Sequence, residues 1–295
     1  MSKYMLTCCS TADLSEEHFK RIEVPFASFT FELDGKQYVD DLGKSIPFDE
    51  FYKKVGEGAN VKTSQVNEKS FEEFFEKYLK DGYDILHVCL SSGISGVMNS
   101  ANMAKEILSS KYPDRKILVL DSLAASSGYG LLVDAMAEKK KEGMSIDELY
   151  NWGMENRLNV HHWFFTTDLT CFIRGGRVSK TAGFVGKMLS ICPLLNVDFE
   201  GKLQVREKIR GKKNVMEKTL EKMIEHAADG TNYSGKCYIS SSQSYEDAKA
   251  LATMIEEKFT NLKGKIEIDN IGTVIGCHTG PGTVALFFFG DKRVD

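Results

Sequence analysis

The sequence lacks the cysteine patterns of a disulfide scaffold or a metal site. Its seven cysteines are an odd number, none forms a Cys-x-x-Cys pair, and none has metal-ligand spacing. The residues around them are mainly apolar, as at Cys89 and Cys237. We therefore predict free, buried thiols in a reducing compartment and no metal site.

Long apolar runs and a leader peptide are absent too. No run approaches the ~20 apolar residues of a membrane span. The N-terminus has no charged stretch followed by an apolar core and a small-residue cleavage site. The net charge of −4 is spread along the chain, whereas a nucleic-acid surface needs a basic stripe. A cytoplasmic protein is expected, with no nucleic-acid partner and at most transient contact with a membrane surface.

The length and composition of the chain suit two globular domains. The chain has 295 residues, of which 42% are hydrophobic and 27% charged. The first half begins with β-rich residues 24–33, which an Asp34-Gly35 turn joins to a strand at 36–39, and residues 63–65 are predicted to lie in a loop. An amphipathic helix is predicted at residues 70–80. Strands at residues 84–90 and 116–120 then alternate with helices at about 97–112 and 124–142. This spacing predicts βαβ units and a parallel sheet.

The second half has a different pattern. It predicts an aromatic strand at residues 161–166, a helix at 179–191, and a hairpin of strands 194–199 and 203–209. The fold class is thus α/β with a parallel-sheet N-terminal domain, residues 1–160, and a mixed-sheet C-terminal domain, residues 161–295.

A serine- and glycine-rich stretch, Ser91-Ser92-Gly93-Ile94-Ser95-Gly96, lies between a predicted strand and helix. Ligands of open α/β sheets bind beyond the carboxyl ends of strands, and a helix start offers free N–H groups to an anion. Capping of the helix by Ser92 or Ser95 explains the pattern equally well. The stretch is neither a phosphate loop nor a nucleophile elbow.

Residues 275–282, Ile-Gly-Cys-His-Thr-Gly-Pro-Gly, predict a tight loop before the last strand. His278 in this loop can donate a hydrogen bond to an anion, although a histidine satisfied by the backbone is an equal alternative. His161 and His162 are adjacent on a predicted strand and point to opposite faces, so we reject them as a metal chelate.

Six short stretches make the chain resemble the DegV family, which includes the fatty-acid-binding subunits of bacterial fatty acid kinase. They follow the order and spacing of the family and cover nearly the whole chain. They are residues 10–14 (Ser-Thr-Ala-Asp-Leu), 63–65 (Thr-Ser-Gln), 90–96, 121–122 (Asp-Ser), 175–180 (Gly-Gly-Arg-Val-Ser-Lys) and 278–282 (His-Thr-Gly-Pro-Gly).

The resemblance implies a two-domain protein that buries a long-chain fatty acid of the palmitate, stearate or oleate class between its domains. It implies that Thr63 and Ser95 bind the carboxyl group, with His278 nearby. Possible supporting residues are Ser10, Ser64, Ser92 and Gly93.

The resemblance also implies a carrier rather than an enzyme, with no cofactor of its own. An ATP-dependent fatty acid kinase would phosphorylate the carboxyl that the carrier presents. Arg210, with Arg206 as its neighbour, best matches an arginine used in that transfer.

The chain departs from the family at Cys9, where an aspartate is usual, and at Val66, where proline is usual. The first change predicts altered polarity near the head group. Two other functions stay open: a hydrolase or acyltransferase that uses Ser95 or a cysteine with His278, and an interaction module with a vestigial pocket.

Overall fold

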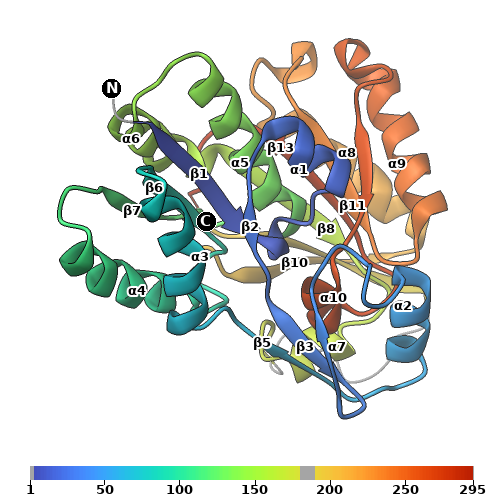
Figure 1. Cartoon of the computed structure of the whole chain (residues 1–295). Helices are drawn as coiled ribbons and strands as arrows, with labels where there is room; N and C mark the ends of the chain where they lie inside the picture. The colour runs from blue at the N-terminus through green and yellow to red at the C-terminus, as the bar shows by residue number, and fades with distance from the viewer. Residues whose placement is uncertain (1–2, 180–189, 295) are drawn as a thin grey trace.

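The protein is built on three β-sheets with helices between and around them (Figure 1). The computed structural model describes residues 3–179 and 190–294. Within that part of the chain, no helix combines the length and the apolar character needed to cross a bilayer.

The first sheet is fully parallel, as predicted, with strand order β2-β1-β6-β7. Its strands are β1 (Tyr4–Cys9), β2 (Phe26–Ala27), β6 (Asp84–Cys89) and β7 (Ile117–Asp121). Every residue of β6 is buried, as expected where helices cover both faces. The helices around it are α1 (Glu16–Ile22), α3 (Glu68–Lys80), α4 (Val97–Lys111), α5 (Ser126–Lys141) and α6 (Ile146–Asn156).

The second sheet is mixed and has the order β10-β9-β8-β13-β11-β12. Its strands are β8 (Val160–Phe165), β9 (Ile191–Val197), β10 (Leu203–Arg210), β11 (Cys237–Ser241), β12 (Glu267–Asn270) and β13 (Val284–Phe289). Only β11 and β12 pair in parallel. Helices α8 (Lys212–His226) and α9 (Tyr245–Lys258) pack against this sheet.

The hairpin prediction for the second half is confirmed by β9 and β10. The predicted helix at 179–191 is wrong at its end, because Ile191 already pairs with Arg210 in the sheet. Residues 180–189 of that prediction lie outside the described residues. The domain boundary at residues 160 and 161 stays a prediction; β8 begins at Val160.

Helix α5 lies between the two large sheets and contacts β8, β11 and β13 of the second one. Its first twelve residues, Ser126 to Ala137, are all buried. A Cβ atom at Gly128 would clash with the His162 ring, and one at Gly130 would clash with the backbone of Ala12. The absence of side chains at these glycines therefore lets α5 approach both halves of the molecule.

The third sheet is small and antiparallel, with the order β4-β3-β5. Its strands are β3 (Thr30–Leu33), β4 (Lys36–Val39) and β5 (Val61–Ser64). Thr63 and Ser64 therefore end a strand, which corrects the sequence interpretation of residues 63–65 as a loop. Such a short, polar strand gives little sequence signal, and its pairing with β3 fixes it.

Helix α10 (Thr273–Thr279) corrects a second loop prediction, because His278 lies in its last turn. Glycine and β-branched residues give this segment low helix propensity. Its first residue, Thr273, donates a hydrogen bond of 2.6 Å to Asp40 from the loop after β4. The helix also contacts α2 (Phe48–Gly56) and α7 (Thr170–Arg174), so tertiary contacts support it.

A buried ion cluster joins α1 and α5 to the second sheet. His18 bonds Asp134 at 3.1 Å and Glu267 at 3.0 Å, and Lys236 reaches Asp134 at 3.0 Å. Burial alone would lower the pKa of His18, but the bonds to Asp134 and Glu267 outweigh it and raise the pKa to about 9. His18 is thus charged at neutral pH.

We expect His18→Gln to remove part of the pH dependence of unfolding. A histidine pKa raised above 6.5 stabilises the fold below pH 6.5, and this stabilisation is lost as the pH rises through about 9. The free energy of unfolding of the wild type should therefore fall between pH 7 and 9 more steeply than that of the variant. Urea titrations at several pH values measure this; equal slopes would contradict the assignment.

Candidate functional site

A cavity of about 510 Å³ is lined by strands of the second and third sheets and by the segments that follow β6 and β7 of the first. This volume is typical of small-molecule sites. Most of its wall is apolar. The apolar residues come from several elements and are Phe29, Leu90, Ile94, Ala125, Phe164, Phe172, Val197, Leu203, Ile271, Val274, Ile275, Ala285 and Phe287.

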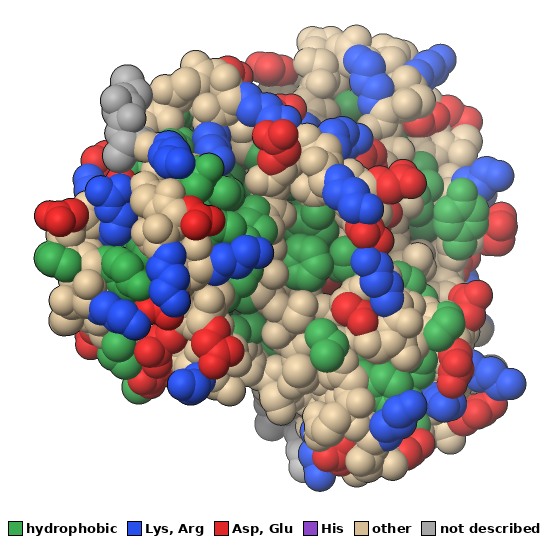
Figure 2. All heavy atoms as spheres, viewed as in Figure 1, with side chains coloured by type: hydrophobic (Ala, Val, Ile, Leu, Met, Phe, Trp, Pro, Cys, Tyr) green, Lys and Arg blue, Asp and Glu red, His purple; other side chains and the backbone are tan. Residues whose placement is uncertain are grey.

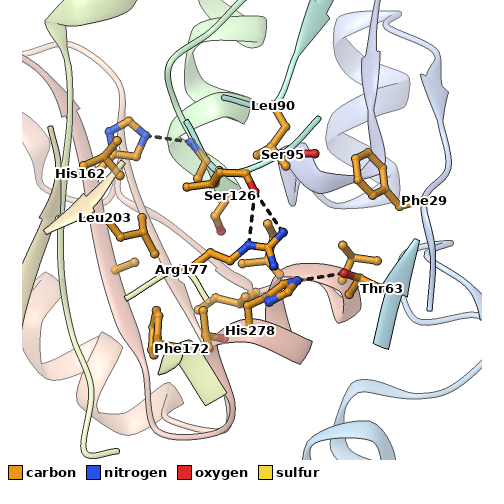
Figure 3. Close-up of a pocket in the computed structure, with 18 of the residues that line it drawn as sticks. Phe29, Thr63, Leu90, Ser95, Ser126, His162, Phe172, Arg177, Leu203 and His278 are labelled. Carbon is orange, nitrogen blue, oxygen red and sulfur yellow. Dashed lines mark hydrogen bonds between the residues drawn. The ribbon is translucent and has the colours of Figure 1, made fainter. Parts of the chain in front are cut away.

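Thr63 and His278 form a hydrogen-bonded pair in the wall of this cavity. Thr63 Oγ1 lies 3.0 Å from His278 Nε2, although the two residues come from β5 and α10 (Figure 3). Burial, with smaller contributions from Arg177 and Arg174, lowers the pKa of His278 to about 4. The imidazole is therefore neutral at pH 7.

The bonding pattern around His278 assigns its tautomer. Nδ1 is buried and has no hydrogen-bond partner, so a proton is better placed on Nε2, where it is donated to Thr63 Oγ1. Thr63 then keeps its own O–H to donate to a ligand.

Ser95 is the second donor of the site. Its Oγ accepts a bond of 3.2 Å from the N–H of Val97, the first residue of α4. This bond satisfies one N–H at the start of α4, but the N-cap is Gly96 and the helix has no side-chain cap, so the interpretation of Ser95 as the helix cap is wrong. Accepting this bond leaves the Ser95 O–H free to donate into the cavity that Ser95 lines.

Arg177 ties the two halves of the site together. Its Nε and Nη2 donate to Ile94 O at 3.2 and 3.0 Å, and its Nη1 donates to Gly175 O at 2.6 Å. These bonds hold the 175–177 loop against the Ser91–Gly96 turn. Arg177 lies in residues 175–180, one of the six stretches that resemble the family, but the sequence alone assigned it no role.

Of the four residues predicted to support the site, only Ser64 lines the cavity. Gly93 lies in a neighbouring surface groove with Arg177, Ser92 is exposed and its N–H donates to Asp121, and Ser10 lines a different cavity.

Two further residues lie away from the cavity wall. Arg210 is exposed at the end of β10. Cys9 is fully buried, with its Sγ 3.6 Å from His87 Nε2. Replacement of the usual aspartate by Cys9 therefore puts no changed side chain on the described lining.

Sequence reasoning missed Gln65, Ser126 and His162, which also line the cavity. Both ring nitrogens of His162 already have backbone partners. Nε2 accepts a hydrogen bond from Ala125 N, and Nδ1 donates to Val160 O at 3.1 Å. The backbone uses both nitrogens, so the ring presents carbon to the cavity. No sequence pattern marks such a histidine.

The pair that the hydrolase alternative needs, Ser95 or a cysteine bonded to His278, is not assembled in the described part of the chain. There, the side-chain bond of His278 goes to Thr63, and none joins it to Ser95 or to a cysteine. Burial raises the pKa of the neighbouring Cys277 thiol well above its usual value, which keeps it protonated and unreactive. The geometry gives the hydrolase alternative no support.

Gly175→Ala tests the position of His278. A Cβ atom at Gly175 would clash with His278 Nδ1, so the ring must move and its bond to Thr63 must weaken. We expect an affinity loss of up to about tenfold for a ligand held by Thr63, measured by calorimetry.

Gly176→Ala serves as the control, because its Cβ would meet nothing within 4 Å although its φ of 71° strains an alanine. An equal loss of affinity in both variants would show that loop strain, not displacement of His278, is the cause.

The cavity is apolar, its neutral hydrogen-bond donors Thr63 and Ser95 lie in its wall, and it is set in a two-domain α/β fold. This arrangement suits an amphiphilic small molecule. The family model of the DegV family, described as uncharacterised proteins, matches residues 7–291. The chain therefore belongs to the DegV family.

Individual relatives agree with this assignment. A DegV domain-containing protein of Clostridium perfringens is 40% identical, and the match covers 99% of each chain. The structure of a fatty-acid-binding DegV family protein from Thermus thermophilus has a TM-score of 0.84 at 27% identity, covering 99% of this chain and 100% of that one.

A third protein shares the fold. It is the fatty acid kinase B3 protein of Streptococcus pneumoniae, loaded with linoleic acid, with a TM-score of 0.82 at 21% identity over 99% of this chain and 100% of that one.

Proposed function

We propose that this protein binds a long-chain fatty acid, with its carboxyl group at Thr63 and Ser95 and its acyl chain along the apolar wall between the two domains. The observation that carries the proposal is the cavity itself, whose two oriented hydroxyl donors adjoin an apolar wall. The likeness to the fatty-acid-binding protein of Thermus thermophilus supports it.

The energetics suit this ligand. Each buried methylene contributes about 0.8 kcal/mol, so a tail of ~15 carbons gives on the order of 10 kcal/mol before ordering costs. The acyl chain thus supplies affinity, and the head group supplies orientation. Because an apolar surrounding raises the pKa of a carboxyl group, neutral hydroxyl donors suffice for it.

We further propose that the protein is a carrier in the cytoplasm, which presents the carboxyl group of its bound fatty acid to an ATP-dependent fatty acid kinase. Arg210 is exposed and available to a partner. Basic residues Arg177 and Lys202 line the groove beside the Ser91–Gly96 turn, called the head-group turn below. A transferred phosphoryl group would need positive charge there. No catalytic residue of its own is required.

Native mass spectrometry of protein purified without added ligand tests the first half. We expect a mass increment that organic extraction identifies as a fatty acid of 16 to 18 carbons (roughly the ~15-methylene tail above). Absence of a bound lipid together with no saturable binding of added palmitate or oleate would overturn the proposal.

Acyl phosphate formation with a bacterial fatty acid kinase and ATP tests the second half. Arg210→Ala should slow transfer while leaving fatty-acid affinity unchanged, and Lys213→Ala, exposed on α8, is the matched control. Turnover of acyl esters by the protein alone would instead favour a hydrolase.

A further inference from the structure

One hydroxyl group in the wall of the cavity described above has no hydrogen-bond partner. It belongs to Thr283, which lines the cavity and is only 1% exposed, and its Oγ1 is unpaired within the described residues. The other buried hydroxyls of the lining are paired. Ser126 donates to Asp13 Oδ2 at 2.6 Å, and Thr279 donates to Gly280 O at 3.3 Å.

The Thr283 side chain points into this cavity. Thr283 directly precedes β13, and Thr283, Ala285 and Phe287 all line the cavity. Alternate residues of a strand point to the same face, so these three side chains share one orientation. The backbone of Thr283 is held by Ser242, whose Oγ accepts the Thr283 N–H and whose N–H donates to the Thr283 carbonyl, both at 2.9 Å. The hydroxyl therefore stays in the wall as long as the sheet is intact.

The wall around this hydroxyl is apolar. Ala285 and Phe287 continue it along β13, and Phe164, which pairs with Ala285 across the sheet, lines the cavity as well. An unpaired buried hydroxyl is costly in such surroundings, and native proteins leave few polar groups in that state. An oxygen atom of a ligand in the cavity would be the partner that the fold itself does not provide.

Two simpler explanations account for less. Threonine is favoured in strands, but valine has a similar shape and is favoured too, so strand propensity does not select the hydroxyl. A bound water is the second explanation. A buried water needs two to four polar partners, and the side chains of Ala285, Phe287 and Phe164 offer none.

We propose that the cavity selects a long-chain acid whose acyl chain carries a hydroxyl group, and that Thr283 pairs with this hydroxyl. The inference rests on the proposed function, because it takes the carboxyl group to lie at Thr63 and Ser95. A threonine hydroxyl both donates and accepts, so it pairs with an alcohol in either direction.

The position of the hydroxyl along the acyl chain is selected as well. With the carboxyl group held at one place, only a hydroxyl on one carbon, or on an adjacent one, lies within hydrogen-bond distance of Thr283. A hydroxyl elsewhere on the chain enters an apolar wall and loses its bonds to water without replacement. Unsubstituted acids still bind through their carboxyl group and chain, but they leave Thr283 unpaired.

Calorimetric titration of the wild type with stearate and with a positional series of monohydroxystearates tests the inference. We expect one isomer, or two adjacent ones, to bind at least as tightly as stearate. The remaining isomers should bind at least about fivefold more weakly than the preferred one, which is the smallest effect expected for a buried hydroxyl without a partner.

Thr283→Val removes the hydroxyl and keeps the approximate shape of the side chain. It should lower the affinity for the preferred isomer, relative to stearate, by at least about fivefold, whereas the affinity for stearate should not fall. Thr279→Val is the matched control, because Thr279 lines the same cavity but its hydroxyl is already bonded to Gly280 O. The ratio of the two affinities should equal that of the wild type in this control.

Two results would overturn the inference and leave the proposed function intact. One is stearate binding with every hydroxylated isomer weaker than stearate, which needs no variant to fold. The other is an isomer preference that Thr283→Val leaves unchanged. If neither stearate nor any isomer binds, the proposed function fails together with this inference.

Discussion

The double variant Thr63→Val/Ser95→Ala should lose about 30-fold or more in affinity for palmitate while keeping its fold. Each substitution removes one hydroxyl donor and leaves a buried carboxyl oxygen without its partner, which costs about 1–3 kcal/mol. In the arrangement assigned above, His278 donates to Thr63 Oγ1 and Val97 N donates to Ser95 Oγ, so each hydroxyl keeps its own proton for the ligand. Calorimetric titration measures the loss.

Ser92→Ala is the matched control, because Ser92 belongs to the same turn but is exposed and does not line the cavity. Its affinity should equal that of the wild type. Unchanged affinity in the double variant would move the carboxyl site elsewhere, and a loss shared by Ser92→Ala would mean that the turn itself, rather than one hydroxyl, is needed.

Arg293→Met should cause the largest loss of stability among these substitutions. Arg293 is 5% exposed and donates to four carbonyls, those of Val197, Asp198, Leu123 and Arg157, at 2.8–3.2 Å. Burial lowers the pKa of Arg293 to about 10, so it stays charged at neutral pH. The side chain thus joins the β9–β10 turn to the loop before α5.

Methionine fills a similar space but leaves those carbonyls without this donor. Each buried carbonyl left without a partner lowers the free energy of unfolding by about 1–3 kcal/mol. We expect a loss of at least about 3 kcal/mol and a melting temperature lower by roughly 6–12 °C. Arg115→Met, which removes one hydrogen bond to Gly82 O and a 3.9 Å ion pair with Asp84 at a half-buried position, should cost clearly less. Equal shifts in the two variants, measured by differential scanning calorimetry, would contradict this account.

Arg293 also bears on the ligand site. The β9–β10 turn that it holds accepts a bond of 2.8 Å from Ser91 Oγ at Gly201 O, and Ser91 begins the head-group turn. Loosening the β9–β10 turn should therefore reduce ligand affinity as well, although by less than loss of the hydroxyl donors. The face of the molecule drawn in Figure 2 carries acidic and basic side chains interspersed with hydrophobic and other side chains.

The sequence predicted the elements whose signal is local. The continuous apolar run of β6 and the helical spacing of apolar residues in α3 can each be recognised from neighbouring residues in the sequence alone. The Asp34-Gly35 turn between β3 and β4 is another case, because both residues have positive φ, 50° and 83°, and this conformation selects those residue types.

Two predictions failed for a common reason. Residues 63–65 and 275–282 were interpreted as loops because they are short and rich in polar, glycine or β-branched residues. Pairing with β3 makes Thr63 part of a strand, and contacts with Asp40, α2 and α7 make His278 part of a helix. Partners distant in the chain stabilise both segments, and a local pattern does not reveal them.

By itself, the sequence determined the α/β class, the parallel first sheet, the family and a short set of polar residues suited to a carboxyl group. Only the tertiary structure decided which of them share one cavity: it placed Thr63 beside His278, gave Ser95 a hydroxyl free to donate, and moved Ser10 to a separate acidic cavity. The reason is physical. Strand and helix patterns arise from residues a few positions apart, whereas a binding site depends on distances between segments that only packing brings together.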